Sequence, residues 1–195
     1  SSGMFIMDTE ARRKLAASAY LLTPGVPFIY YGEEIGLRGT RGSAQTDANR
    51  RLPMQWTSGD DPWRTAWPEG TTYDMTKQVK EGAFELLEEP FSLTNHYKKV
   101  LNVRNAYPWI KDAIVDDVAV ANNALAALKL SSRDGTKNIY VVHNFAAEEM
   151  ALDLSRLSDD ELKIAYDIFT NQTRASISEN NLTLSAYSSV IFEKK

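Results

Sequence analysis

The 195-residue sequence contains no cysteine and only two histidines, His96 and His143. Without cysteine there are no disulfides and no thiolate metal sites, and two separated histidines do not predict a histidine-rich metal centre. Lysine and arginine number 22 against 26 acidic residues, so the chain lacks the basic excess typical of nucleic-acid-binding proteins. We therefore expect no cofactor or metal in this segment, no nucleic-acid partner, and structural roles for both histidines.

Long apolar runs are missing as well. No run approaches the roughly 20 residues that a membrane-spanning helix requires, so we expect no membrane span in this segment. The opening residues Ser1-Ser2-Gly3 lack the basic region and apolar stretch of a signal peptide. Because 43% of the residues are hydrophobic, the chain can nevertheless bury a core.

The first half of the sequence predicts two longer helices, one apolar strand and a further helical stretch that begins near Thr76. Apolar residues recur at helical spacing from Leu15 to Leu22, and Thr23-Pro24-Gly25 ends that pattern. The run Val26–Tyr31 follows without polar alternation, which is typical of a strand buried on both faces of a parallel sheet. A second helix is predicted from Ser92, a residue that caps helices well, to about Asn105.

A long irregular segment, residues 36–75, separates these elements. It is rich in glycine, proline and polar residues and contains Trp56, Trp63 and Trp67. Connections longer than about 12–15 residues are uncommon in compact domains unless they have a function. We therefore expect a functional loop here.

The pattern changes after about Lys111 to short apolar runs separated by turn signals such as Arg133-Asp134-Gly135. The runs are Ala113–Val120, Ala124–Leu130, Asn138–Phe145, Met150–Leu154, Leu162–Phe169, Ala175–Ile177, Leu182–Leu184 and Ser188–Phe192. Closely spaced short strands of this kind predict an antiparallel β-sandwich or barrel.

Three motifs carry a family resemblance: TPGVPFIYYGEEIGL at residues 23–37, DANRRLPMQW at 47–56 and SLTNHYKKVLNVRN at 92–105. Together they resemble the C-terminal third of the α-amylase family, glycoside hydrolase family 13, and are similar to bacterial α-amylases and oligo-1,6-glucosidases. The resemblance implies an α+β fragment: the last helix–strand–helix part of a TIM (β/α)8 barrel, followed by an all-β antiparallel sandwich known as domain C. It places the barrel remnant at residues 1–110, with 36–75 as the substrate-cleft loop, and domain C at 111–195.

The acidic pair Glu33 and Glu34 follows the predicted strand directly. In a TIM barrel the chemistry lies at the C-terminal ends of the strands, so this pair is near the active face. The family's three catalytic carboxylates, however, come from strands 4, 5 and 7, which the resemblance places before residue 1. We therefore expect no catalytic residue in this chain and no activity from it alone. The parent protein is expected to cleave α-glucosidic bonds of starch or maltooligosaccharides by the two-carboxylate retaining route.

Asp47 and Arg51 are the expected substrate-binding residues. They resemble family positions that bind sugar hydroxyls near the cleavage site, and a carboxylate that accepts beside a guanidinium that donates suits that task. The competing interpretation is an exposed ion pair of little energetic value. Arg50 stands where oligo-1,6-glucosidases carry a smaller residue. The loop aromatics Trp63, Trp67 and Tyr73 are interpreted either as sugar-stacking rings or as local anchors.

Two other functions are compatible with the sequence. One is a non-catalytic starch-binding or carbohydrate-binding module, and the other is an amylase-like ectodomain without enzyme activity, such as those of amino-acid transporter subunits. The α-amylase reading implies an α-glucan or maltooligosaccharide substrate in the parent and allows Ca²⁺ elsewhere in it. It favours a secreted or cell-surface parent over a cytoplasmic one. An unpaired apolar strand at Val26–Tyr31 would also promote self-association of the fragment.

Overall fold

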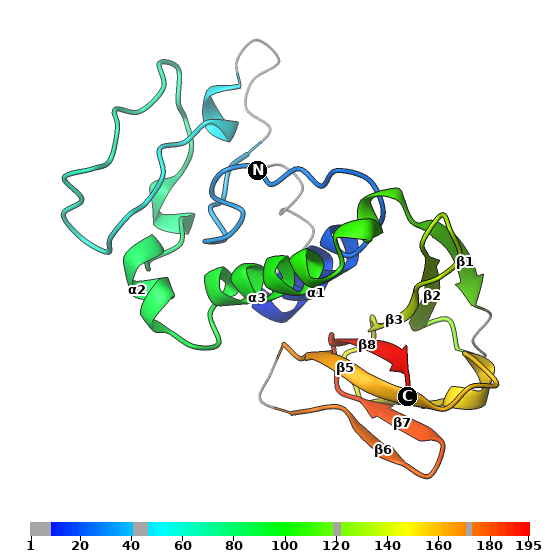
Figure 1. Ribbon diagram of the computed structural model, residues 1–195. Helices are drawn as coiled ribbons and strands as arrows, with labels where there is room; N and C mark the ends of the chain where they lie inside the picture. Colours follow the sequence, from blue (N-terminus) through cyan, green and yellow to red (C-terminus); the bar gives the residue numbers. More distant parts are fainter. Residues whose placement is uncertain (1–8, 41–46, 119–121, 171–172) are drawn as a thin grey trace. The chain divides into compact units, whose positions relative to one another are not determined.

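A computed structural model describes residues 9–40, 47–118, 122–170 and 173–195 (Figure 1). The chain divides into two compact units, and each is described by itself. The first comprises Ser1–Arg13 and Phe28–Tyr97, and the second comprises Lys14–Pro27 and Lys98–Lys195. The domain bounds 1–110 and 111–195 stay a prediction.

Each of the two long helices begins next to a hydroxyl side chain that accepts a backbone hydrogen bond, and at α3 this residue is the expected cap Ser92. Helix α1 spans Glu10–Leu21, and the Thr9 hydroxyl accepts a hydrogen bond of 3.3 Å from the backbone N–H of Arg12. Helix α3 spans Leu93–Ala106, and the Ser92 hydroxyl accepts one of 3.1 Å from the N–H of Asn95. Shorter helical segments are η2 (Ala48–Arg50), η3 (Met75–Lys77), α2 (Ala83–Glu88), η4 (Pro108–Asp112) and η5 (Leu154–Arg156).

Arg104 on α3 holds the end of α1 in place. Its guanidinium donates to the carbonyl oxygens of Leu21 at 2.5 Å, Thr23 at 2.8 Å and Gly25 at 2.5 Å. These carbonyls belong to the helix end and the turn behind it, where intrahelical partners run out. Gly25 has φ +95°, a conformation that glycine adopts without steric cost. The predicted helix stop at Thr23–Gly25 is therefore a hydrogen-bonded turn.

The run Val26–Tyr31 differs from the expected strand. Residues 26–30 carry no strand pairing, and the Val26 and Phe28 side chains are 87% and 88% exposed. A β-strand forms only where a neighbouring strand satisfies its backbone donors and acceptors, and the described residues place no strand beside this run. The apolar sequence is therefore present without the sheet that it predicts.

This exposed run should make the 195-residue chain self-associate. Apolar segments with unpaired backbone groups recruit other chains, and Phe28 is the most exposed large side chain in the run. We expect the light-scattering mass of the wild-type chain to rise with concentration, whereas Phe28→Asp should stay close to the monomer mass. A wild-type chain that stays monomeric across the same concentration series would contradict this expectation.

All eight strands predicted after Lys111 are present. They are β1 (Ile114–Val118), β2 (Leu125–Ser131), β3 (Asn138–Asn144), β4 (Met150–Asp153), β5 (Leu162–Ile168), β6 (Ser176–Ser178), β7 (Asn181–Leu184) and β8 (Ser189–Lys194). A five-stranded sheet has the order β1-β2-β3-β8-β5 and a three-stranded sheet the order β4-β7-β6, with every pairing antiparallel (Figure 1). The predicted antiparallel two-sheet region is confirmed.

A single apolar core joins the two sheets. Its buried members are Leu125, Ala127, Tyr140, Val142, Leu152, Leu154, Leu157, Leu162, Leu182, Leu184, Val190 and Phe192. Strands β2, β3, β5 and β8 contribute from the larger sheet, and β4 and β7 contribute from the smaller one. Such face-to-face packing of alternating residues is what stabilises a β-sandwich.

Asn144, at the end of β3, is a polar link between the sheets. Its buried side-chain amide donates to the carbonyl oxygens of Leu184 at 3.1 Å, Ser185 at 3.0 Å and Glu148 at 2.8 Å. Its side-chain oxygen accepts a bond of 2.9 Å from the N–H of Ala146. Since Leu184 ends β7, one buried amide ties the larger sheet to the smaller sheet.

His143, next to this link, makes the stability of the fold depend on pH. Its imidazole is buried with Nδ1 2.7 Å from the Ser189 hydroxyl, and burial lowers its pKa from 6.5 to about 4. The unfolded chain therefore takes up a proton near pH 6.5, whereas the folded chain does so only near pH 4. Stability should be complete above pH 6.5 and fall by up to about 3 kcal/mol as the pH drops to 4.

Urea unfolding at several pH values measures this dependence, with His143→Gln as the variant that cannot titrate. The variant should show a flatter profile between pH 6.5 and 4. Carboxylates with a lowered pKa, such as Asp134 at about 2, change the stability only below pH 4, outside the range in which His143 titrates. An unchanged slope in the variant would show that His143 is not the responsible group.

Candidate functional site

The two predicted binding residues meet at the short helix η2. Arg51 Nη2 lies 3.2 Å from Asp47 Oδ2, and Arg50 Nη1 lies 3.2 Å from Asp47 Oδ1. The Asp47 carboxylate is therefore held between two guanidiniums. The side chains of Asp47, Arg50 and Arg51 are 48%, 34% and 66% exposed, so a dissolved ligand reaches all three groups.

Asn49, within η2, is hydrogen-bonded to Thr72 through its side chain and to Thr40 through its backbone. Its side chain exchanges two hydrogen bonds with Thr72, donating to the hydroxyl at 2.9 Å and accepting from the N–H at 2.8 Å. Its carbonyl oxygen accepts a bond of 3.0 Å from the N–H of Thr40. A side chain at Gly39 would place a Cβ 2.4 Å from that oxygen, so glycine permits the approach. The backbone that carries Asp47, Arg50 and Arg51 is therefore held in place by hydrogen bonds to Thr72 and Thr40.

Tyr31, at the end of the run Val26–Tyr31, is hydrogen-bonded to Leu52, the residue that follows Arg51. Its hydroxyl donates a bond of 3.0 Å to the carbonyl oxygen of Leu52, and its ring lies 4.8 Å from that of Tyr30. Burial raises the pKa of Tyr31, with a further contribution from Tyr30, while the positive charge of Arg51 opposes the rise. The sequence did not single out Tyr31. The only signal was its place at the end of the apolar run.

Glu33 and Glu34 lie in a pair of turns that follows the run. The N–H of Glu33 donates to the Tyr30 carbonyl at 3.1 Å, and the N–H of Gly36 donates to the Glu33 carbonyl at 3.0 Å. Gly32 begins this reversal with φ +84°, a conformation that glycine adopts without steric cost. The Glu34 carbonyl accepts a bond of 2.9 Å from the Thr94 hydroxyl on α3. The two glutamates are therefore part of a turn docked on a helix.

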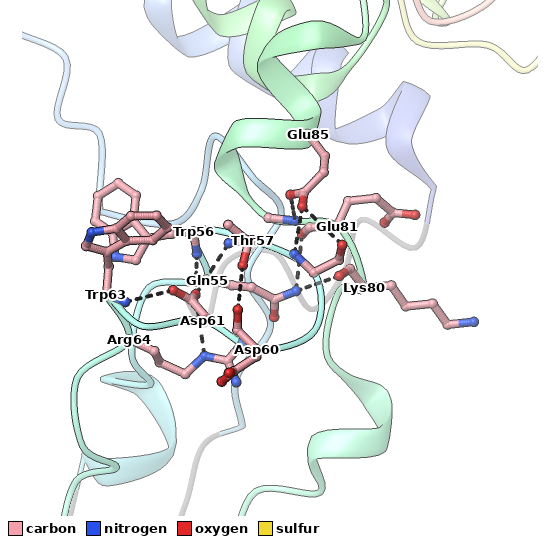
Figure 2. Close-up of polar contacts among 12 residues, drawn as sticks. Gln55, Trp56, Thr57, Asp60, Asp61, Trp63, Arg64, Lys80, Glu81 and Glu85 are labelled. Carbon is pink, nitrogen blue, oxygen red and sulfur yellow. Dashed lines mark hydrogen bonds and ion pairs between the residues drawn. The ribbon is translucent and has the colours of Figure 1, made fainter.

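A second organised part of the loop centres on Asp61, whose side chain is only 1% exposed. Its carboxylate accepts hydrogen bonds from the N–H groups of Trp56 at 2.7 Å, Thr57 at 3.4 Å and Trp63 at 3.2 Å (Figure 2). Arg64 Nε lies 3.7 Å from the same group. Burial pulls the pKa of Asp61 upward, but these donors and Arg64 outweigh it and hold the pKa below its ordinary value.

The start of α2 is docked on the same segment. The Glu85 carboxylate accepts from the N–H of Ser58 at 2.9 Å and from the N–H of Gly82 at 3.0 Å, and the Gln55 amide donates to the Lys80 carbonyl at 2.7 Å (Figure 2). The N–H of Phe84 donates to the Trp56 carbonyl at 3.0 Å. These bonds fix α2 to residues 55–58.

The loop aromatics separate into two groups. Trp63 packs edge to face with Phe84, with ring centroids 5.4 Å apart and ring planes at 86°, and Trp56 lies 6.1 Å from the same phenylalanine. Trp67 is 40% exposed, and no ring contact involves it within the described residues. The sequence did not predict the role of Phe84, because α2 is too short to show a helical pattern.

The described part of the chain has neither a cluster of metal ligands nor a membrane-spanning helix. In residues 9–40, 47–118, 122–170 and 173–195, no group of three or more His, Cys, Asp or Glu side chains could hold a metal ion. Over the same ranges, each helix is too short or too polar to cross a bilayer. The expectation that this segment uses no cofactor stays a prediction.

Comparison with known proteins gives two family matches. Residues 3–113 match the model described as "Alpha amylase, catalytic domain", and residues 133–191 match "Alpha-amylase SusG C-terminal domain". Alpha-amylase SusG of Bacteroides thetaiotaomicron is 32% identical over 187 residues, covering 92% of this chain and 25% of SusG. Alpha-amylase 3 of Dictyoglomus thermophilum is 30% identical over 186 residues, covering 91% of this chain and 33% of that enzyme.

A solved structure, Eubacterium rectale Amy13B, superposes with a TM-score of 0.84 at 25% identity and covers 96% of this chain. The match covers 35% of Amy13B. The chain therefore spans between a quarter and about a third of the length of these relatives.

Proposed function

Because this chain belongs to the α-amylase family, we propose that it serves as the C-terminal part of a retaining glycoside hydrolase. The substrate class is starch or maltooligosaccharides, and the bonds cleaved are α-glucosidic. The observation that carries the proposal is the match to the α-amylase catalytic domain over residues 3–113, which include η2 and its Asp47–Arg51 pair. The names of the two curated relatives, both α-amylases, support the substrate class.

Asp47 and Arg51 are proposed to bind sugar hydroxyls beside the bond that is cleaved. An ionised carboxylate accepts two hydroxyl hydrogens, and a guanidinium donates in a fixed planar fork. Their mutual distance of 3.2 Å keeps both groups oriented before a sugar arrives, which lowers the entropic cost of binding. Neither residue is assigned a proton-transfer or nucleophilic role.

The catalytic carboxylates are not assigned to any residue of this chain. The turn that contains Glu33 and Glu34 supports this choice, because adjacent residues of a turn do not present two carboxylates across one bond as retaining hydrolysis requires. The domain bounds 1–110 and 111–195, and a secreted or cell-surface location of the whole protein, are further parts of the proposal.

Hydrolysis of maltoheptaose tests the proposed function. A protein of the relatives' length that carries this chain should release reducing ends with retained anomeric configuration, and the 195-residue chain alone should release none above buffer. Binding of starch without any hydrolysis by the longer protein would favour the carbohydrate-binding alternative. Turnover by the 195-residue chain that is lost in Glu33→Gln or Glu34→Gln would overturn the assignment of no catalytic residue.

A further inference from the structure

Arg51 lies where the regular structure of η2 ends. Its N–H donates a bond of 3.2 Å to the Ala48 carbonyl, which is the last backbone bond of the short helix. Its backbone angles, φ −111° and ψ 36°, are neither helical nor extended. The direction of the chain after Arg51 is therefore not fixed by regular hydrogen bonding, and contacts of the following residue have to set it.

Leu52, the following residue, is held in two ways. Its side chain is 1% exposed, and its carbonyl oxygen accepts a hydrogen bond of 3.0 Å from the Tyr31 hydroxyl. The peptide group that contains this carbonyl ends at Pro53, which has no N–H to donate. Hydrogen bonding can therefore orient this peptide group only through the carbonyl that Tyr31 binds.

Tyr31 reaches that carbonyl from a separate segment whose backbone is itself held. The N–H of Glu33 donates to the Tyr30 carbonyl at 3.1 Å, in a turn that spans Tyr31. The N–H of Leu37 then donates to the Gly32 carbonyl at 2.8 Å. The ring of Tyr31 also lies 4.8 Å from that of Tyr30. The hydroxyl is thus presented from a turn that is closed by its own hydrogen bonds.

We propose that Tyr31 is a positioning residue for Arg51 and that it acts through the Leu52 carbonyl. Its bond holds the chain after Arg51, as the bond to Ala48 holds the chain before it, so the guanidinium stays where it binds a sugar hydroxyl. Hydrogen bonds weaken steeply when their geometry is poor, so a small displacement of the guanidinium lowers the rate. This role rests on the proposed function, and Tyr31 takes no part in proton transfer.

A double-mutant cycle in a protein of the relatives' length tests this role. Tyr31→Phe removes only the hydroxyl, and it should lower kcat/KM on maltooligosaccharides by about two- to tenfold, as for the loss of one neutral hydrogen bond. In the Arg51→Ala background the same substitution should cause no further loss, because the positioned group is gone. An equal loss in both backgrounds, or no loss in either, would overturn the proposal.

Thr94→Val is the matched control. The Thr94 hydroxyl also donates to a backbone carbonyl, that of Glu34 at 2.9 Å, but this bond joins α3 to the turn and not to η2. Its removal should leave kcat/KM within about twofold of the parent value in both backgrounds, as expected for independent sites. If Thr94→Val lowers kcat/KM as much as Tyr31→Phe, and Arg51→Ala also abolishes that loss, any loosening of the turn displaces Arg51 and the specific role of Tyr31 is wrong.

NMR relaxation of the arginine Nε–Hε groups measures the positioning without any substrate. In the 195-residue chain, at a concentration where it is monomeric, Tyr31→Phe should lower the order parameter of Arg51, whereas Thr94→Val should not. An unchanged order parameter in Tyr31→Phe would overturn the positioning role, whatever the kinetics. If the order parameter falls but Arg51→Ala leaves kcat/KM unchanged, the positioning stands, and the substrate-binding role of Arg51 in the proposed function is wrong.

Discussion

Replacing Arg51 by alanine is expected to lower kcat/KM on maltooligosaccharides by about 10–1000-fold in a protein of the relatives' length. A hydrogen bond from a charged donor to a substrate hydroxyl contributes roughly 1.5–3 kcal/mol, and it can strengthen in the transition state. The fold should survive, since Arg51 is 66% exposed and Asp47, its ion-pair partner, is also paired with Arg50. Steady-state kinetics and thermal unfolding of the same preparations measure both effects.

Arg50→Ala is the matched control for this substitution. Both arginines lie 3.2 Å from Asp47, but only Arg51 has the position that the family resemblance assigns to sugar binding. We expect Arg50→Ala to change kcat/KM by less than about tenfold, as for the loss of an exposed ion pair. A larger loss of kcat/KM in Arg50→Ala than in Arg51→Ala would show that Arg50, and not Arg51, binds the sugar. Unchanged kinetics with a lower melting temperature in Arg51→Ala would support the surface-pair interpretation.

Replacing Asn144 by alanine is expected to lower the free energy of unfolding of the chain by about 3–5 kcal/mol. Its side-chain amide satisfies three carbonyl oxygens, and its side-chain oxygen satisfies one N–H, all around a fully buried position. Alanine would leave the carbonyl oxygens of Leu184 and Ser185 without this partner at buried positions, whereas Glu148 is exposed. Leaving a buried polar group without a partner costs more than the hydrogen bond contributes. Urea unfolding monitored by tryptophan fluorescence measures the loss.

Asn138, at the other end of the same strand, provides the control. Its side-chain oxygen is buried and has no hydrogen-bond partner in the described part of the chain. Asn138→Ala should therefore change stability by less than about 1 kcal/mol. A similar loss in both variants would show that asparagine in β3 acts through strand propensity, and that the link between the sheets contributes little.

The β-sheet region could be predicted from the sequence because its information is local. Each strand is a short apolar run between turn residues, and all eight runs became strands within about two residues of the expected bounds. Helices α1 and α3 were predictable for a similar reason, since apolar residues recur at helical spacing in the first and Ser92 marks the start of the second. A helical stretch was expected near Thr76, where the structure has the short η3 (Met75–Lys77). The sequence did not give the bounds of α2, because six residues show little periodicity and the cap is Gly82.

The run Val26–Tyr31 shows why local information can be insufficient. Its apolar pattern is that of a parallel strand, but a strand is a property of two or more neighbouring segments, and none lies beside this run in the described residues. The Phe28 side chain, which would be buried in a sheet, is therefore 88% exposed. The sequence predicts what this segment would form given partners, and the structure shows the segment without them.

The candidate site was predictable only in part for the same reason. Asp47 and Arg51 were identified through a motif, and they meet because they flank the two ends of one short helix. The role of Asp61 depends on three backbone N–H groups that its side chain meets only after folding, and nothing in the sequence distinguishes it from the exposed Asp60. Tyr31 likewise depends on a bond to Leu52, which lies 21 residues away.

Asp47 and Arg51 are proposed to bind glucan beside the bond that an α-amylase cleaves. A crystal structure of a protein of the relatives' length, carrying this chain and soaked with a non-hydrolysable maltooligosaccharide, tests it most directly. We expect glucose hydroxyls about 2.7–3.2 Å from the Asp47 carboxylate and the Arg51 guanidinium. A maltooligosaccharide bound at the catalytic centre, with Asp47 and Arg51 bonded to each other and to no sugar, would contradict it.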